Sequence, residues 1–215
     1  MNKGDKTMQI TSNSFDNDQK ILETYAFGIP DAEAHMALGQ NRNPPLAWQD
    51  VPEGTNSLVL MCIDPDAPSV ADDVNQESHT ISATLPRAEF CHWVMVDIAP
   101  TETLIAEGTC SDGVTKGGKS APNGPAGSRQ GLNDYTGFLA GDKDMRGNYF
   151  GYDGPCPPWN DEIVHHYQFI LNATDLERCP VDGAFTASDV KQALEGHVLA
   201  TARIVGTYTL NPDKA

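Results

Sequence analysis

Three apolar runs of strand length narrow the range of folds open to this chain more than any other feature. SLVLMCI (57–63) reads as a buried strand, and CHWVMVDI (91–98) and HHYQFILNA (165–173) read as two more. A fourth strand is expected at ATARIVGTYTL (200–210), whereas TASDVKQALEG (186–196) is the best candidate for a helix. The pattern predicts a mostly β fold with a small helical part.

The remaining segments fit a single domain that covers residues 1–215, with its core at about 8–210. Short early strands are expected at MQITSN (8–13) and ILETYAF (21–27). Two polar or glycine-rich stretches carry no regular pattern and are interpreted as insertion loops, at about 69–90 and 111–150.

Charge and composition exclude several classes of partner. The formal net charge is -16, so the surface repels nucleic acid and anionic membranes at long range. No run of 18 apolar residues is present, and the polar N-terminus has no apolar core of a signal peptide. We therefore expect no stable membrane insertion, and a cytoplasmic location is the simplest interpretation.

The five cysteines are an odd number and form no CxxC pair or zinc-finger spacing. A complete disulfide framework is therefore not expected. Cys62 and Cys91 lie in apolar runs and are expected to be buried packing residues.

Polar rings and carboxylates gather where the predicted strands begin or end. Asp64 directly follows the first strand, His92 lies at the start of the second, and His165 opens the third. Because side chains alternate along a strand, His165 and Tyr167 share one face, while His166 points to the other. One imidazole and one phenol beside an apolar core indicate the wall of a small polar pocket.

Four motifs in this order resemble one known family. The chain is similar to the phosphatidylethanolamine-binding proteins, which include the Raf kinase inhibitor proteins and their bacterial relatives. The motifs are DPDAP (64–68), HW (92–93), GPCPP (154–158) and HHY (165–167), and PPLAW (44–48) and GHVLA (196–200) point to the bacterial branch. The resemblance runs from about residue 8 to residue 210.

The resemblance implies a large central antiparallel sheet, flanked by a smaller sheet and a few short helices. It also implies a small anion pocket whose ligand-binding residues would be Asp64, His92, Cys156, Pro157, His165 and Tyr167. The residues that shape this pocket would be Asp66, Pro68, Trp93 and Pro158. The DPDAP segment is read as a turn and is a candidate position for a cis proline.

The function implied by the resemblance is binding of a small anion or phosphorylated head group, such as phosphate, acetate or phosphoethanolamine. Such a protein would regulate a partner such as a kinase or a protease, with no cofactor and no metal. Asp64 is unexpected beside an anion, and two explanations stay open. It could orient a histidine and raise its pKa, or it could meet the amine of an ethanolamine group.

The competing interpretation is an enzyme. Asp64, His92 and His165 could hold a metal ion, or Cys156 could act as a nucleophile in a hydrolytic reaction. No HxH or HExxH spacing supports a metal site, and Cys156 is flanked by prolines that lack the N–H groups of an oxyanion hole.

Three departures from the family pattern bear on these expectations. His166 stands where many members carry arginine, and its position on the opposite face predicts a modest effect on the pocket. The two insertion loops are expected to reshape the pocket mouth or to form a homodimer contact. The C-terminal helix that covers the pocket in vertebrate members has no counterpart after residue 210.

Overall fold

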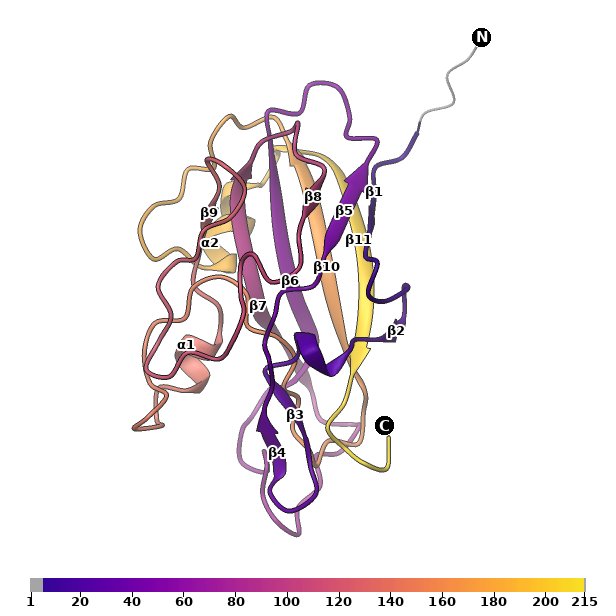
Figure 1. Ribbon diagram of the computed structural model, residues 1–215, viewed down its shortest axis with the longest axis vertical. Coiled ribbons are helices and arrows are strands. Elements are labelled where there is room, and N and C mark those ends of the chain that lie inside the picture. The colour runs from indigo at the N-terminus through magenta and orange to yellow at the C-terminus, as the bar shows by residue number, and fades with distance from the viewer. Residues whose placement is uncertain (1–5, 215) are drawn as a thin grey trace.

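The structure, a computed structural model that describes residues 6–214, is built on three β-sheets (Figure 1). Residues 1–5, which belong to the polar N-terminus discussed above, lie outside the described residues. The central sheet has six strands in the order β2-β11-β10-β6-β7-β9. Its strands are β2 (Gln19–Lys20), β6 (Ser57–Pro68), β7 (Arg87–Ile98), β9 (Arg129–Gln130), β10 (His165–Thr174) and β11 (Val198–Tyr208).

The two smaller sheets come from the N-terminal half of the chain and the segment after β7. One has the order β1-β5-β8, with strands β1 (Gln9–Thr11), β5 (Leu46–Gln49) and β8 (Leu104–Ile105). The other is the hairpin of β3 (Gly28–Asp31) and β4 (His35–Leu38). The fold is mostly β, as predicted, but the central sheet is mixed, because the short strand β2 pairs with β11 in parallel.

Both faces of the central sheet are covered, which explains the continuous apolar run of β6. Leu58, Leu60 and Cys62 face the three-stranded sheet and pack in one buried cluster with its Trp48. The alternate residues Val59, Met61 and Ile63 belong to a second cluster that includes Val190 of α2 (Ala187–Ala193). A strand buried on both sides loses the apolar–polar alternation of a surface strand.

A β-bulge in β7 determines where His92 lies. Cys62 pairs with Trp93 and the next residue, Ile63, pairs with Cys91, so His92 is an extra residue with no partner on β6. Bulges are often found beside functional sites, where they redirect a side chain. His92 is thereby placed against Tyr167 of β10, and the two ring centroids are 5.0 Å apart.

The predicted strand at 21–27 is wrong, and so is the predicted end of the strand at 57–63. Residues 21–27 form no strand, and a short 3-10 helix, η1 (Glu23–Tyr25), lies within them. β6 does not end at residue 63 but continues through the DPDAP segment to Pro68, with an irregular register between Asp64 and Ala67. No peptide bond of the described residues is cis. Asp and Pro disfavour strands, and here the pairing with β7 overrides that preference.

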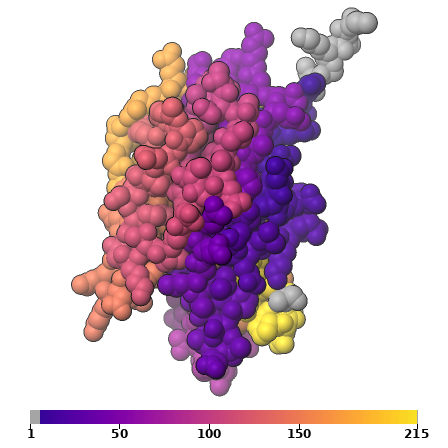
Figure 2. All heavy atoms as spheres, viewed as in Figure 1, coloured from indigo at the N-terminus to yellow at the C-terminus, as the bar shows by residue number. Residues whose placement is uncertain are grey.

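The insertion loops are only partly irregular. The last four residues of 69–90 belong to β7, and 111–150 contain β9 and the one-turn helix α1 (Tyr135–Phe138). Figure 2 shows that the segment from about 100 to 150 and the indigo to purple residues from 6 to about 50 form much of the face in view. Across residues 6–214, no helix combines the length and apolar character that a membrane crossing requires. After β11 the described residues, which end at 214, contain no helix.

The backbone at Gly154 lies so close to the N-terminal segment that no side chain fits. A Cβ at this position would lie 1.9 Å from the carbonyl oxygen of Tyr25 and 2.8 Å from the hydroxyl of Tyr152. We expect Gly154→Ala to lower the free energy of unfolding by roughly 2–3 kcal/mol, because neither atom can yield without moving buried structure. Urea denaturation measures the change.

Gly137→Ala is the matched control, because an added Cβ there meets no atom within 4 Å. We expect this variant to stay within about 0.5 kcal/mol of the parent protein. Equal stabilities for the two variants would contradict the close packing of the 154–158 segment.

Candidate binding pocket

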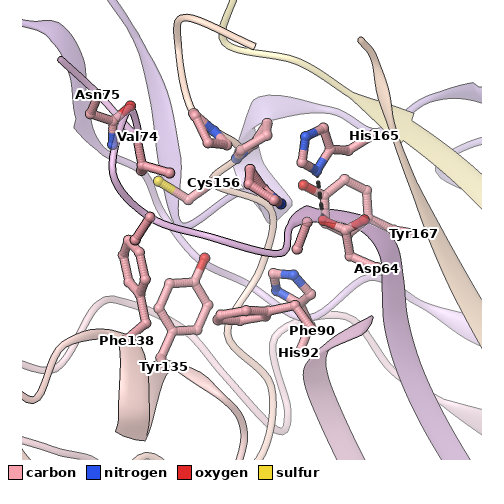
Figure 3. Close-up of a pocket in the computed structure, with 15 residues that line it drawn as sticks. Asp64, Val74, Asn75, Phe90, His92, Tyr135, Phe138, Cys156, His165 and Tyr167 are labelled. Carbon is pink, nitrogen blue, oxygen red and sulfur yellow. Dashed lines mark hydrogen bonds and ion pairs between the residues drawn. The ribbon is translucent and has the colours of Figure 1, made fainter. Parts of the chain in front are cut away.

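One cavity of about 110 Å³ lies at the end of the central sheet where β6, β7 and β10 bring their polar residues together (Figure 3). The GPCPP segment forms one wall, and side chains from the two insertion loops border the rest. Its lining residues are Asp64, Ala67, Pro68, Ala71, Val74, Asn75, Phe90, His92, Tyr135, Phe138, Cys156, Pro157, Pro158, His165 and Tyr167.

A buried chain of charges holds His165 in place. Its Nδ1 lies 2.7 Å from Oδ2 of Asp64, and its Nε2 lies 3.2 Å from Oδ2 of Asp161. Asp161 is in turn held by the guanidinium of Arg87 at 2.5 and 3.0 Å. Burial alone would lower the pKa of His165, but hydrogen bonds and charge from Asp161 and Asp64 raise it to about 9. His165 is therefore an imidazolium at neutral pH, and we call these four side chains the charge clamp.

The charge clamp decides what His165 can offer a ligand. An imidazolium has two N–H groups, and each one here donates to a carboxylate. No ring N–H is left to point into the cavity. Asp64 thus raises the pKa of a histidine, as one of the two explanations for this residue requires, but that histidine is not free to donate to an anion.

His92 has the opposite character. Its Nδ1 donates to the backbone carbonyl of Asp153 at 2.8 Å, while its Nε2 has no hydrogen-bond partner among residues 6–214. Burial lowers the pKa of His92, and the carboxylate of Asp64 offsets this only in part. At neutral pH the ring is therefore uncharged, with the proton on Nδ1 and a lone pair on Nε2.

Tyr167 presents a buried hydroxyl group. Its side chain is fully buried, and its oxygen has no hydrogen-bond partner within the described part of the chain. In Figure 3 this hydroxyl points into the space between the labelled side chains. Burial raises the pKa of Tyr167 well above its usual value, so the group stays a phenol that can donate one hydrogen bond and accept others.

The GPCPP wall is rigid and chemically quiet. The carbonyl of Pro155 accepts from the backbone N–H groups of Phe27 and Gly28, and the carbonyl of Gly154 accepts from the Tyr135 hydroxyl at 2.7 Å. Burial raises the pKa of the Cys156 thiol to about 12. The thiol is therefore protonated at neutral pH, which is the state of a packing residue rather than of a nucleophile.

Apolar side chains surround the mouth of the cavity. Phe90, Val74 and Ala71 line it, and Phe138 of α1 does so while its side chain stays 53% exposed. These residues come from β7 and the two insertion loops. Both insertion loops therefore contribute side chains to the wall of this cavity.

The six predicted ligand-binding residues all lie around this one cavity, and the predicted pocket-shaping residues Pro68 and Pro158 also line it. Asp66 does not line it. Its carboxylate accepts from the backbone N–H and the ring Nδ1 of His166, at 2.9 and 2.8 Å, on the exposed side of β10. Trp93 lies elsewhere too: it is fully buried in the core and donates to Gln130 at 2.6 Å.

Sequence reasoning missed the residues that complete the site. Arg87 and Asp161 belong to the charge clamp, and Tyr135 and Phe138 come from α1. Asp161 lies four residues before His165, a spacing that could have suggested a local contact. The position of Arg87 at the start of β7 follows only from the pairing of the strands.

The proposed metal site of the enzyme alternative finds no support in the geometry. Residues 6–214 contain no group of three or more His, Cys, Asp or Glu side chains arranged to hold a metal ion. Both nitrogens of His165 are engaged with carboxylates, so this ring would have to leave the charge clamp to act as a ligand.

The chain is thus a β-sheet protein with a small, mostly apolar cavity at one end of its central sheet. Residues 11–209 match the family described as phosphatidylethanolamine-binding protein. The chain belongs to this family, because the match covers nearly all of its length.

Relatives come from both bacteria and archaea. A UPF0098 protein of Methanothermobacter thermautotrophicus is 36% identical over 191 residues, which are 87% of this chain and 97% of the relative. The UPF0098 protein YbcL of Escherichia coli is 30% identical over 202 residues, covering 94% and 87% of the two chains. The E. coli YbcL crystal structure, described as a new member of the mammalian PEBP family, is similar with a TM-score of 0.67 and 28% identity, over 95% of this chain and 99% of that one.

The charge clamp predicts a pH dependence of stability. The pKa of His165 is about 9 in the folded protein, against an ordinary value of 6.5. Its contribution to stability is therefore complete below about pH 6.5 and is lost as the pH rises through 9, where the folded protein gives up the extra proton. We expect a loss of roughly 3 kcal/mol from this group between pH 6 and 10.

Urea denaturation at several pH values tests this, with His165→Gln as the control for all other titrating groups. The variant should be less stable at pH 6 and should lose less stability on going to pH 10. Parallel pH profiles for the two proteins would show that His165 is not protonated between the two carboxylates.

Proposed function

We propose that the pocket binds a small anionic or phosphorylated group. The observation that carries this proposal is the Tyr167 hydroxyl, which is buried beside the cavity and has no partner among residues 6–214. A buried polar group left unpaired costs about 1–3 kcal/mol. A ligand oxygen that accepts this hydrogen bond recovers that cost, so the site favours a ligand with an exposed oxygen.

The size of the cavity supports a head group rather than a large ligand. Its volume is about 110 Å³, whereas pockets for drug-sized molecules occupy roughly 300–1,000 Å³. Phosphate, acetate and the phosphoethanolamine head group belong to the small class. The apolar mouth around Phe138 and Val74 would contact whatever extends from the head group towards solvent.

The charges around the cavity imply that His92 must change its protonation state when an anion binds. The lining contains no lysine or arginine, and the negative charge of Asp64 is balanced by His165. Neutral His92 offers a lone pair at Nε2, which repels an anion. Uptake of one proton converts Nε2 into a charged donor, so anion binding is coupled to protonation of His92.

The hydrogen bonds of Asp64 are also compatible with the second explanation given above, in which this carboxylate contacts a ligand amine. Its Oδ2 accepts from His165, and its Oδ1 accepts from the backbone N–H of Asp66 at 2.7 Å. A carboxylate oxygen can accept a further hydrogen bond. A ligand amine could therefore contact Asp64 while the phosphate of the same head group contacts Tyr167 and His92.

Regulation of a protein partner such as a kinase or a protease is the second part of the proposal. The family resemblance supports this part, and so does Phe138, which is exposed at the pocket mouth. A ligand in the pocket would contact Phe138 and so alter the surface that a protein partner could bind.

We also propose a reducing compartment such as the cytoplasm, because all five cysteines are free thiols. No observation favours the enzyme alternative, since the Cys156 thiol is protonated at neutral pH.

Tyr167→Phe tests the observation on which the proposal depends. The change removes one buried oxygen and keeps the ring, so we expect affinity for phosphate to fall by about ten- to 150-fold, the effect of one hydrogen bond to a charged group. Isothermal titration calorimetry with phosphate and with phosphoethanolamine provides the measurement.

Tyr208→Phe is the matched control. Its hydroxyl is also buried, but it donates to the carbonyl of Gly28 at 3.0 Å and does not line the cavity. This variant should lose stability and keep the affinity of the parent protein. Unchanged binding in Tyr167→Phe would remove the main support for the proposal.

Proton uptake by His92 gives a second test. The pKa of His92 lies below 6.5 in the free protein, so the ring is neutral at about pH 7.5 and binding must protonate it. We expect affinity for acetate, whose own charge is constant between about pH 6 and 8, to fall as the pH rises, by up to tenfold per unit. Calorimetry in two buffers of different ionisation enthalpy should report about one proton taken up per ligand. A flat pH profile, or no proton uptake, would contradict the role of His92.

A further inference from the structure

A buried polar network lies behind His92, on the side away from the cavity. At its centre lies the carboxylate of Asp153, a fully buried residue. This carboxylate accepts from the side-chain amides of Asn41 and Asn133, both at 2.7 Å, and from the ammonium group of Lys119 at 3.0 Å. Residue 41 of the N-terminal segment and two positions of the insertion loop 111–150 thus converge on one side chain.

The backbone of Asp153 is joined directly to His92. The N–H of Asp153 donates to the carbonyl of His92 at 3.0 Å, and the carbonyl of Asp153 accepts from Nδ1 of His92 at 2.8 Å. Because His92 is the extra residue of the β7 bulge, it has no register partner on β6, and its backbone carbonyl bonds to residue 153. A displacement of residue 153 would therefore move the histidine ring.

Lys119 is the residue that ties this network to the insertion loop 111–150. Its side chain is 11% exposed, and its ammonium group also donates to the carbonyl of Tyr152 and to Oγ of Ser111 at 3.4 Å. Burial lowers the pKa of Lys119, while the adjacent Asp153 carboxylate raises it in part. The lysine holds the carboxylate of residue 153 and the carbonyl of residue 152 at the same time.

We propose that Lys119 and Asp153 are a positioning pair for His92. They fix the backbone at residues 152–153 so that the Asp153 carbonyl accepts the hydrogen bond from Nδ1–H of His92 and only Nε2 is left for the ligand. The ligand part of this inference rests on the proposed function, whereas the tautomer part does not. The insertion loop thereby contributes to the pocket from behind, in addition to lining its mouth.

Stability alone is a weak explanation for a buried ion pair between Lys119 and Asp153. A buried ion pair often contributes no more than well-packed apolar side chains of the same volume would. The neighbours that carry charge or rings near His92, which include Asp64, Asp134, Tyr135 and Tyr167, make no hydrogen bond to its ring. Within residues 6–214 the carbonyl of Asp153 is therefore the one group that selects the tautomer.

The first experiment needs only the parent protein. Nitrogen-15 NMR of the histidine rings at about pH 8, where His92 is neutral, distinguishes a proton on Nδ1 from a proton on Nε2. We expect His92 as a single Nδ1–H tautomer. A single Nε2–H tautomer would overturn the inference.

Variants then test whether the pair holds that tautomer. Lys119→Met removes the ammonium group. Asn41→Gly removes one amide donor to Asp153 and the acceptor of the Gly154 N–H, at a position with φ of 53°, which glycine adopts freely. Both should give a mixture of His92 tautomers. Both should also lower affinity for acetate about tenfold, as loss of a supporting hydrogen bond does at metal-binding histidines.

Arg129→Met is the matched control. Arg129 pairs at 2.6 Å with Asp97, a largely buried residue on another part of β7, so its loss also removes the nearest cation of a carboxylate, and Arg178 remains at 3.9 Å. This variant should be destabilised but keep the Nδ1–H tautomer and the affinity. If Lys119→Met does not fold, Asn41→Gly carries the test alone.

The outcomes separate the two proposals. If Lys119→Met and Asn41→Gly keep one Nδ1–H tautomer and full affinity, the pair is only structural and the inference fails. If the parent protein binds neither acetate nor phosphate, the proposed function fails. The tautomers of His92 in the variants would then still decide whether the pair positions the ring.

Discussion

The arrangement of this pocket depends on one buried imidazolium. His165 lies between the carboxylates of Asp64 and Asp161, and Arg87 neutralises the second carboxylate from the start of β7. The charge clamp therefore joins β6, β7, β10 and the loop before β10 at the end of the sheet where the cavity lies. Its two positive and two negative charges balance, which makes the burial of His165 and the two carboxylates tolerable. Loss of one member would leave an unpaired charge and lower the free energy of unfolding by about 3–5 kcal/mol.

Local periodicity was enough to predict part of the site. The two-residue repeat of a strand places His165 and Tyr167 together and turns His166 outward, and the structure has this arrangement. The order of four short motifs then predicted that Asp64, His92 and Cys156 lie around the same cavity. The placement of Asp64, His92, His165 and Tyr167 depends on strands that are strongly marked in the sequence. Cys156 lies in a loop, and its placement came from the family resemblance alone.

The parts that could not be predicted depend on contacts between distant segments. The bulge at His92 exists only in the register between β6 and β7, and no residue type marks it in the sequence. The same register explains why Trp93, the neighbour of His92, lies in the core instead of the pocket. The end of β6 was missed because aspartate and proline disfavour strands locally, while Arg87 donates to the carbonyl of Asp66 and helps to hold that segment beside β7.

The bulge at His92 also separates the architecture of the sheet from the chemistry of the pocket. His92 has no partner on β6, and its backbone carbonyl is bound by the loop instead of by a strand. A different side chain at this position would leave the register of β6 and β7 as it is. The ligand preference of such a pocket can therefore change, through this one residue and the loops behind it, while the six-stranded scaffold stays constant.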